Sequence, residues 1–87
     1  MPQEQTSLFN IEELNTEMIR VTLKEVYDSL DERGYNPTNQ IVGYLISGDP
    51  GYISSYKDAR NKIQELDRAK IVEILLDEFQ KNNKWDI

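Results

Sequence analysis

The first predicted helix carries more apolar surface than a chain of 87 residues can easily cover alone. Its apolar residues recur at helical spacing from about Ile11 to Arg33, and Gly34 then supplies a left-handed stop. On a wheel of ~100° per residue they fill two neighbouring faces. One face has Ile11, Leu14, Met18 and Val21, and the other has Ile19, Leu23, Val26, Tyr27 and Leu30. We therefore predict that a second copy covers part of this helix in a homodimer. The alternative is that the other helices of the same chain wrap around it.

A run of fifteen residues without a charge, positions 34–48, predicts the next helix. Asn36 is a favourable N-cap, Pro37 suits the first helical position, and the run closes on a glycine. The helix is apolar on every side, so we expect it in the interior of the assembly. Gly43 costs helix propensity relative to alanine, and we expect it to permit a close helix crossing.

The second half of the chain contains further helix signals. Asp49 followed by Pro50 predicts a turn or one short helical stretch. Ser55 with Asp58 predicts a capping box at the start of another helix. Asp67 either caps a separate last helix that reaches about position 82, or lies within one continuous helix over 56–82. The fold class predicted is therefore all-α, a small bundle of four to five helices that forms a homodimer.

The predicted boundaries divide the chain into three parts. Residues 1–9 lack apolar periodicity and are expected to form a flexible N-terminal tail. Residues 10–82 are expected to form a single helical domain, which begins with Asn10 and Glu13 as a capping box. Residues 83–87 are expected to be a frayed C-terminus. No stretch approaches the ~20 apolar residues that span a bilayer, and the first residues do not resemble a secretory signal, so we expect a cytoplasmic protein without membrane insertion.

Composition excludes several functions. The absence of cysteine and histidine removes disulfides, thiol nucleophiles and Cys/His zinc sites, and no cofactor or metal is expected. Sixteen acids against ten bases give a net charge of −6, which argues against binding to nucleic acid. Adjacent acids such as Glu12 and Glu13 are explained by a solvated helix face. We therefore expect a non-enzymatic protein whose partners are proteins, and an enzyme using carboxylates alone is the least favoured alternative.

One basic segment stands out within this acidic chain. Residues 54–70 hold five bases and three acids. In a continuous helix, Arg60 and Arg68 would share a side, with Lys57 next to Arg60. This basic patch, Lys57, Arg60 and Arg68, is interpreted as a docking surface for an acidic or phosphorylated element. The alternative is that these residues only provide solubility and i,i+4 ion pairs.

The chain resembles a known family over most of its length. The run GYNPTNQIVGYLISGDPGYI at positions 34–53, followed by KDARN at positions 57–61, closely resembles the IreB/ReoM family of small proteins from Gram-positive bacteria. The chain has Ser55, Gln64 and Glu65 where the family commonly has basic residues, so its basic surface is thinner.

The resemblance implies a cytoplasmic, all-helical homodimer without enzymatic activity. It implies phosphorylation by a membrane-anchored Ser/Thr kinase with extracellular PASTA domains, reversed by a cognate phosphatase. The unphosphorylated protein would promote Clp-dependent degradation of the enzyme that commits UDP-N-acetylglucosamine to peptidoglycan, and phosphorylation would relieve this, with effects on antibiotic tolerance. The segment EQTSLF at positions 4–9 looks like the family's phosphoacceptor element, which nominates Thr6, with Ser7 as a second possible acceptor.

Two hypotheses for the switch follow. A phosphate on Thr6 adds about −1.5 to −2 charge. Either the tail then folds onto the patch of Lys57, Arg60 and Arg68, or it repels a partner that approaches this patch. A structural homodimer that acts as an assembly scaffold is the alternative function.

Overall fold

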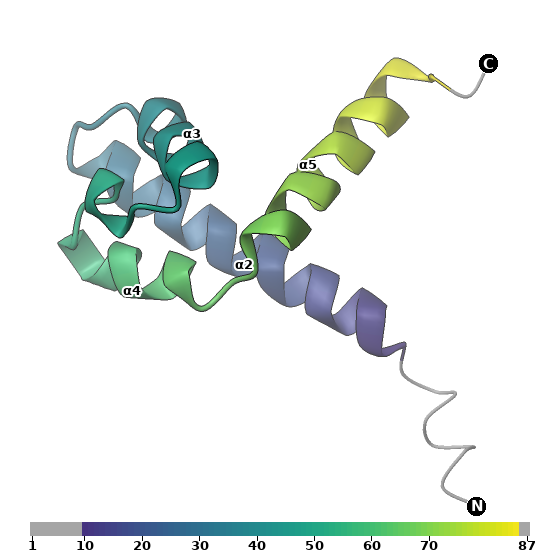
Figure 1. Ribbon diagram of the computed structural model, residues 1–87, viewed down its shortest axis with the longest axis horizontal. Helices are drawn as coiled ribbons and strands as arrows, with labels where there is room; N and C mark the ends of the chain where they lie inside the picture. The colour runs from purple at the N-terminus through teal and green to yellow at the C-terminus, as the bar shows by residue number, and fades with distance from the viewer. Residues whose placement is uncertain (1–9, 86–87) are drawn as a thin grey trace, which may run out of the picture.

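The computed structural model describes residues 10–85, in which all regular elements are helical. In chain order they are α2 (Ile11–Glu32), α3 (Pro37–Ser47), the 3₁₀ turns η1 (Pro50–Tyr52) and η2 (Tyr56–Asp58), α4 (Ala59–Gln64) and α5 (Arg68–Asn83). Figure 1 shows α3 and α4 gathered around one half of α2, whereas α5 starts near the middle of α2 and projects away. The prediction of an all-helical chain is confirmed for the described residues, and the predicted tail, residues 1–9, lies outside them.

The ends of α2 are set by local chemistry, as predicted. The Asn10 side chain accepts hydrogen bonds from the backbone N–H groups of Glu12 and Glu13, at 2.9 and 3.1 Å. At the other end, Gly34 has a φ of 90°, in the left-handed region that residues with a Cβ seldom adopt. The first four N–H groups of a helix have no partner within the helix, and the Asn10 side chain accepts from two of them. The helix therefore begins and ends where the sequence indicated.

The single chain covers only part of α3, and its expected position in the interior of the assembly stays a prediction. Its boundaries agree with the prediction, because Asn36 caps Asn39 at 3.0 Å and Gly48 ends the helix with a φ of 76°. Ile41 and Tyr44 are buried, but Val42 and Ile46 remain 45% and 80% exposed. The absence of charge in this run therefore does not mean that every side of α3 is covered by its own chain.

The core lies between α2 from Ile19 onward, α3, the η1–α4 segment and the first turn of α5. Its buried apolar residues are Ile19, Val26, Leu30, Ile41, Tyr44, Ile53, Ala59, Ile63 and Ile71. Ile71 is the buried residue of α5, and Ile74 packs partly buried against the same core, so the first two turns of this helix anchor it there.

Gly43 permits a close approach, but not a helix crossing as predicted. A Cβ built on Gly43 would overlap the ring of Tyr52, which belongs to η1. The ring therefore lies directly against the backbone of α3, where only glycine leaves room for it.

Replacing Gly43 by alanine should have opposite effects in two backgrounds. In the unchanged chain, Gly43→Ala should lower the free energy of unfolding by about 1 to 2 kcal/mol, because the added methyl displaces Tyr52. In a Tyr52→Ala chain the same change should raise stability by up to about 1 kcal/mol, since alanine is the better helix former. Urea titrations of the four proteins measure both values, and equal signs in the two backgrounds would contradict the contact.

The predicted capping box at Ser55 and Asp58 is wrong. The Ser55 side chain makes no capping hydrogen bond, and Lys57 and Asp58 take left-handed backbone angles, with φ of 51° and 64°. This turn directs the side chains of Tyr56 and Lys57 toward Glu32 at the end of α2, and the helix α4 starts only after it.

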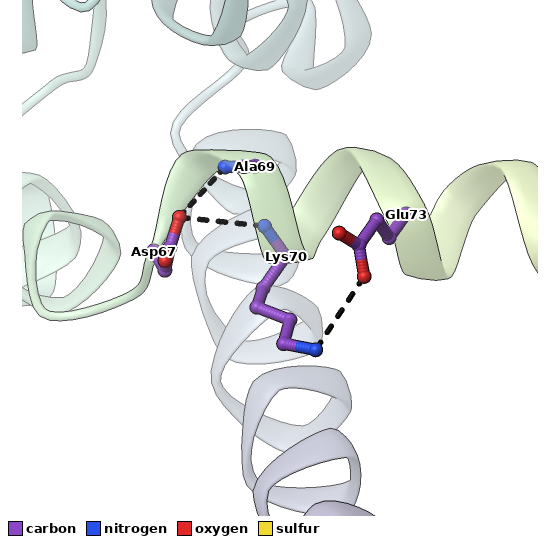
Figure 2. Close-up of polar contacts among 4 residues, drawn as sticks. All are labelled: Asp67, Ala69, Lys70 and Glu73. Atoms are coloured by element: carbon purple, nitrogen blue, oxygen red, sulfur yellow. Dashed lines mark hydrogen bonds and ion pairs between the residues drawn. The ribbon is translucent and has the colours of Figure 1, made fainter.

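The second half of the chain forms two separate helices, which the sequence left open. Helix α4 ends at Gln64, and Asp67 caps α5 by accepting from the N–H groups of Ala69 and Lys70, at 2.9 and 3.4 Å. Figure 2 shows this cap, with the Lys70 side chain reaching Glu73 one turn further along.

Two apolar stripes remain uncovered within the single chain. Each of these side chains is 44 to 60% exposed: Ile11, Leu14, Met18 and Val21 on α2, and Val72, Leu75, Leu76 and Phe79 on α5. The radius of gyration is 15.2 Å, compared with about 12 Å for a compact chain of this length. Within residues 10–85, no helix has both the length and the apolar character needed to cross a bilayer.

Candidate functional site

Lys57 of the predicted basic patch is bound to the end of α2. Its Nζ lies 2.8 Å from a carboxylate oxygen of Glu32. The Tyr56 hydroxyl donates to the other oxygen at 3.1 Å, and the Arg33 guanidinium lies 5.2 Å from the centre of the Tyr56 ring. These four residues form one cluster, in which the charge of Lys57 is already balanced.

The cluster favours the charged forms of both partners. The hydrogen bond from Lys57, and then that from Tyr56, hold the pKa of Glu32 below its usual value. The same pair raises the pKa of Lys57. Any stability from Glu32 is therefore present above its ordinary pKa and is lost as the pH falls through its lowered pKa. Because both side chains are about half exposed, the contribution is reduced by solvent screening.

Arg60 and Arg68 contact a different part of the chain. Arg60 donates from Nε to the backbone carbonyl of Ile53 at 2.8 Å and is partly buried. Arg68 donates from Nη1 to the carbonyl of Leu45 at 3.0 Å, and its guanidinium lies against Gly48. The partial negative charge at the C-terminal end of α3 also stabilises a cation at this position.

The structure thus divides the predicted patch. Arg60 and Arg68 both bind carbonyls of the segment 45–53, whereas Lys57 is drawn to Glu32 on α2. The reason is that residues 57–68 are not one helix: left-handed angles precede α4, and a break separates α4 from α5. The role of these residues in partner binding stays a prediction.

A second region, an acid-lined hollow, was missed by sequence reasoning. It has a volume of about 560 Å³ and lies where the first turns of α2 face α5. Its lining consists of Asn10, Glu12, Glu13, Thr16, Glu17, Arg20, Asp77 and Lys81. The sequence shows the charged faces of both helices, but it does not show that these faces meet.

Two ion pairs organise this hollow. Arg20 on α2 is bound to Glu78 on α5, which joins the two helices. Lys81 is paired with Asp77 one turn earlier on α5, at 3.1 Å. Both cations of the hollow are therefore already engaged, and four carboxylates line it.

The surface between α2 and α5 becomes apolar beyond the Arg20–Glu78 pair. A groove of about 300 Å³ is lined there mainly by Ile19, Leu23, Tyr27, Ile74 and Leu75. This groove lies beside the uncovered stripe of α5, because Leu75 belongs to both. Within residues 10–85, no group of three or more acidic residues is arranged to hold a metal ion.

The predicted phosphoacceptor, Thr6, and its neighbour Ser7 lie outside the described residues. They do lie within the part of the chain that matches a known family. The model of the IreB regulatory phosphoprotein family matches residues 4–81. The match also includes Lys57, Arg60 and Arg68, and it extends from the predicted tail almost to the end of α5.

Proposed function

Because the chain belongs to the IreB regulatory phosphoprotein family, we propose that it regulates peptidoglycan synthesis and that a Ser/Thr kinase controls it through Thr6. The observation that carries this proposal is a family match over residues 4–81, which includes Thr6. In its unphosphorylated form the protein binds the enzyme that commits UDP-N-acetylglucosamine to peptidoglycan and promotes Clp-dependent turnover of that enzyme. Phosphorylation by a PASTA-domain kinase relieves this effect, and the cognate phosphatase restores it.

The working unit is a homodimer in the cytoplasm. The support for a dimer is the pair of apolar stripes on α2 and α5, which their own chain leaves about half exposed. Stable interfaces cover about 800 Å² on each partner and have an apolar centre. Eight large apolar side chains on two helices offer a surface of that kind. The same observation favours an assembly scaffold as the alternative function, which would need no kinase.

Thr6→Ala should abolish kinase labelling of the purified protein. Thr6 carries the hydroxyl group that accepts the phosphate, so its loss removes the acceptor. Ser7→Ala is the matched control and should be labelled like the unchanged chain. Phosphate incorporation measured by intact-protein mass spectrometry distinguishes them. Full labelling of Thr6→Ala with loss of labelling in Ser7→Ala would move the site to Ser7, and no labelling of any protein would favour the scaffold.

Arg68→Ala should weaken capture of the target enzyme about tenfold or more, since charge-assisted hydrogen bonds contribute about 1.5 to 3 kcal/mol. Arg68 is exposed and carries donors beyond the one bound to Leu45. Lys24→Ala removes another exposed cation, on α2, where it is paired with Asp28, and should leave capture unchanged. Equal affinities of the two variants in a binding titration would remove Arg68 from the docking surface.

A further inference from the structure

We infer that Glu32, at the end of α2, holds the turn of residues 55–58 in a left-handed form and so prevents residues 56–58 from becoming the first turn of α4. The inference goes beyond the proposed function, because it requires neither a kinase nor a target enzyme. It gives this turn two forms. One is the left-handed turn of the structure, and the other is a helix start with Ser55 as its N-cap.

Two consecutive residues of the turn have backbone angles that residues with a Cβ seldom adopt. Lys57 has φ 51° and ψ 33°, and Asp58 has φ 64° and ψ 22°. In this region the Cβ comes close to the following carbonyl oxygen. Aspartate tolerates the region better than most residues, and the Asp58 carboxylate here accepts from the Asn61 side chain at 2.9 Å. Lysine has no such compensation, so contacts with other parts of the chain must hold its conformation.

The carboxylate of Glu32 binds the turn at two points. Lys57 Nζ lies 2.8 Å from one oxygen, and the Tyr56 hydroxyl donates to the other at 3.1 Å. The Arg33 guanidinium, 5.2 Å from the centre of the Tyr56 ring, adds a contact from the same end of α2. In a regular helix, neighbouring side chains diverge by ~100° and do not face the same partner. The left-handed turn is therefore what allows Tyr56 and Lys57 to share one carboxylate.

The local sequence favours the other form. Ser55 is a good N-cap residue, and Asp58 three positions later suits the first turn of a helix. In the structure the Ser55 side chain makes no capping hydrogen bond, so this preference is not used. Ile53 and Ala59 are fully buried on either side of the turn and keep their places in the core in both forms. The change is thus confined to residues 54–58, and α4, which has six residues, gains one turn.

The form of the turn decides whether Lys57 joins Arg60. In the left-handed form Lys57 is bound to Glu32, while Arg60 binds the carbonyl of Ile53. In the helical form Lys57 and Arg60 lie three positions apart in one helix and share a face. An acidic group of a partner that took Lys57 from Glu32 would therefore favour the helical form. Glu32 competes with such a partner for the same cation.

NMR of a Glu32→Ala protein tests the inference. A strong nuclear Overhauser effect between the N–H and Hα protons of one residue marks a positive φ, because these protons are closest together there. The unchanged chain should show this signal at Lys57 and Asp58. The Glu32→Ala protein should lose it at both residues and gain the contacts between positions i and i+3 that are typical of a helix. Alanine suits the end of α2, and Glu32 lies outside the core, so the variant should fold.

Glu25→Ala is the matched control. Glu25 also lies on α2 and is paired with a lysine of α4, Lys62, at 3.5 Å. Its side chain is 53% exposed, compared with 52% for Glu32. The control removes the same charge and one ion pair between the same parts of the chain, but no contact with the turn. It should keep the positive-φ signals at Lys57 and Asp58.

A further substitution tests the helical form itself. In the unchanged chain, where Ser55 caps nothing, Ser55→Ala should change the equilibrium constant of unfolding by less than about twofold. In the Glu32→Ala protein, where Ser55 becomes the N-cap, the same substitution should raise this constant about fivefold. Unfolding in urea of both single variants, the double variant and the unchanged chain measures the two values.

Four results would each overturn the inference. They are retention of the positive-φ signals in the Glu32→Ala protein, their loss in the Glu25→Ala protein, equal responses to Ser55→Ala in the two backgrounds, and an unfolded Glu32→Ala protein. The last result counts because both forms of the turn keep the same core.

Discussion

A protein carrying Leu76→Glu is expected to sediment as a monomer at concentrations where the unchanged chain is a dimer. Leu76 lies in the uncovered stripe of α5 and is 54% exposed in the single chain. In the proposed dimer a glutamate there would be buried without a partner, at a cost of several kcal/mol. Each 1.4 kcal/mol weakens association about tenfold, so the dimer should be at least about 100-fold weaker.

The control for this experiment adds the same charge elsewhere. Gln64→Glu, at an exposed position of α4, should leave the sedimentation profile unchanged. Both variants should keep the helical circular dichroism of the original, because neither residue belongs to the core. Sedimentation of the unchanged chain only as a monomer at high concentration would contradict the dimer, and a dimeric Leu76→Glu protein would exclude the α5 stripe from the interface.

Leu30→Ala should reduce the free energy of unfolding by about 3 to 5 kcal/mol. Leu30 is fully buried on α2 and belongs to the core formed with α3 and α4. Its truncation removes transfer free energy and leaves a cavity that the surrounding residues only partly fill. Since small domains are stable by about 5 to 15 kcal/mol in total, the loss is a large share. Urea titration followed by circular dichroism measures it.

The same substitution on the same helix provides the comparison. Leu14→Ala changes a leucine that is 49% exposed in the single chain. Below the concentration at which the protein associates, this change should cost less than about 1 kcal/mol, and it should cost more where the dimer forms. Equal losses for the two variants in dilute solution would mean that the first turns of α2 are covered within one chain.

The sequence predicted the helix ends that depend on neighbouring residues. Asn10 and Asn36 cap the starts of α2 and α3 through their side chains. Gly34 and Gly48 take left-handed angles at the C-terminal ends of the same two helices. The same kind of reasoning failed at Ser55, where a capping box was expected. There the side chains of Tyr56 and Lys57 bind the carboxylate of Glu32, which is more than twenty residues away in the chain. Local propensity cannot indicate such a contact.

The sequence predicted which basic residues belong to the candidate site, but it did not predict which groups they contact. Composition alone drew attention to Arg60 and Arg68, because basic residues are sparse in this acidic chain. Their hydrogen bonds to the carbonyls of Ile53 and Leu45 could not be foreseen, since these carbonyls are brought near by the packing of η1 and α3. The separation of Lys57 from Arg60 and Arg68 also results from tertiary packing, because Lys57 binds Glu32 on α2.

Short-range signals were therefore sufficient for the helical class of this chain and for the bounds of α2 and α3, because a cap or a left-handed glycine acts within a few residues. The angle at which α5 leaves α2 depends on Ile71 in the core and on the Arg20–Glu78 pair, whose two residues are 58 positions apart in the chain. That angle places the charged faces of the two helices opposite each other and leaves their apolar stripes open. Only packing in three dimensions sets it, since burial of a side chain depends on everything that surrounds it.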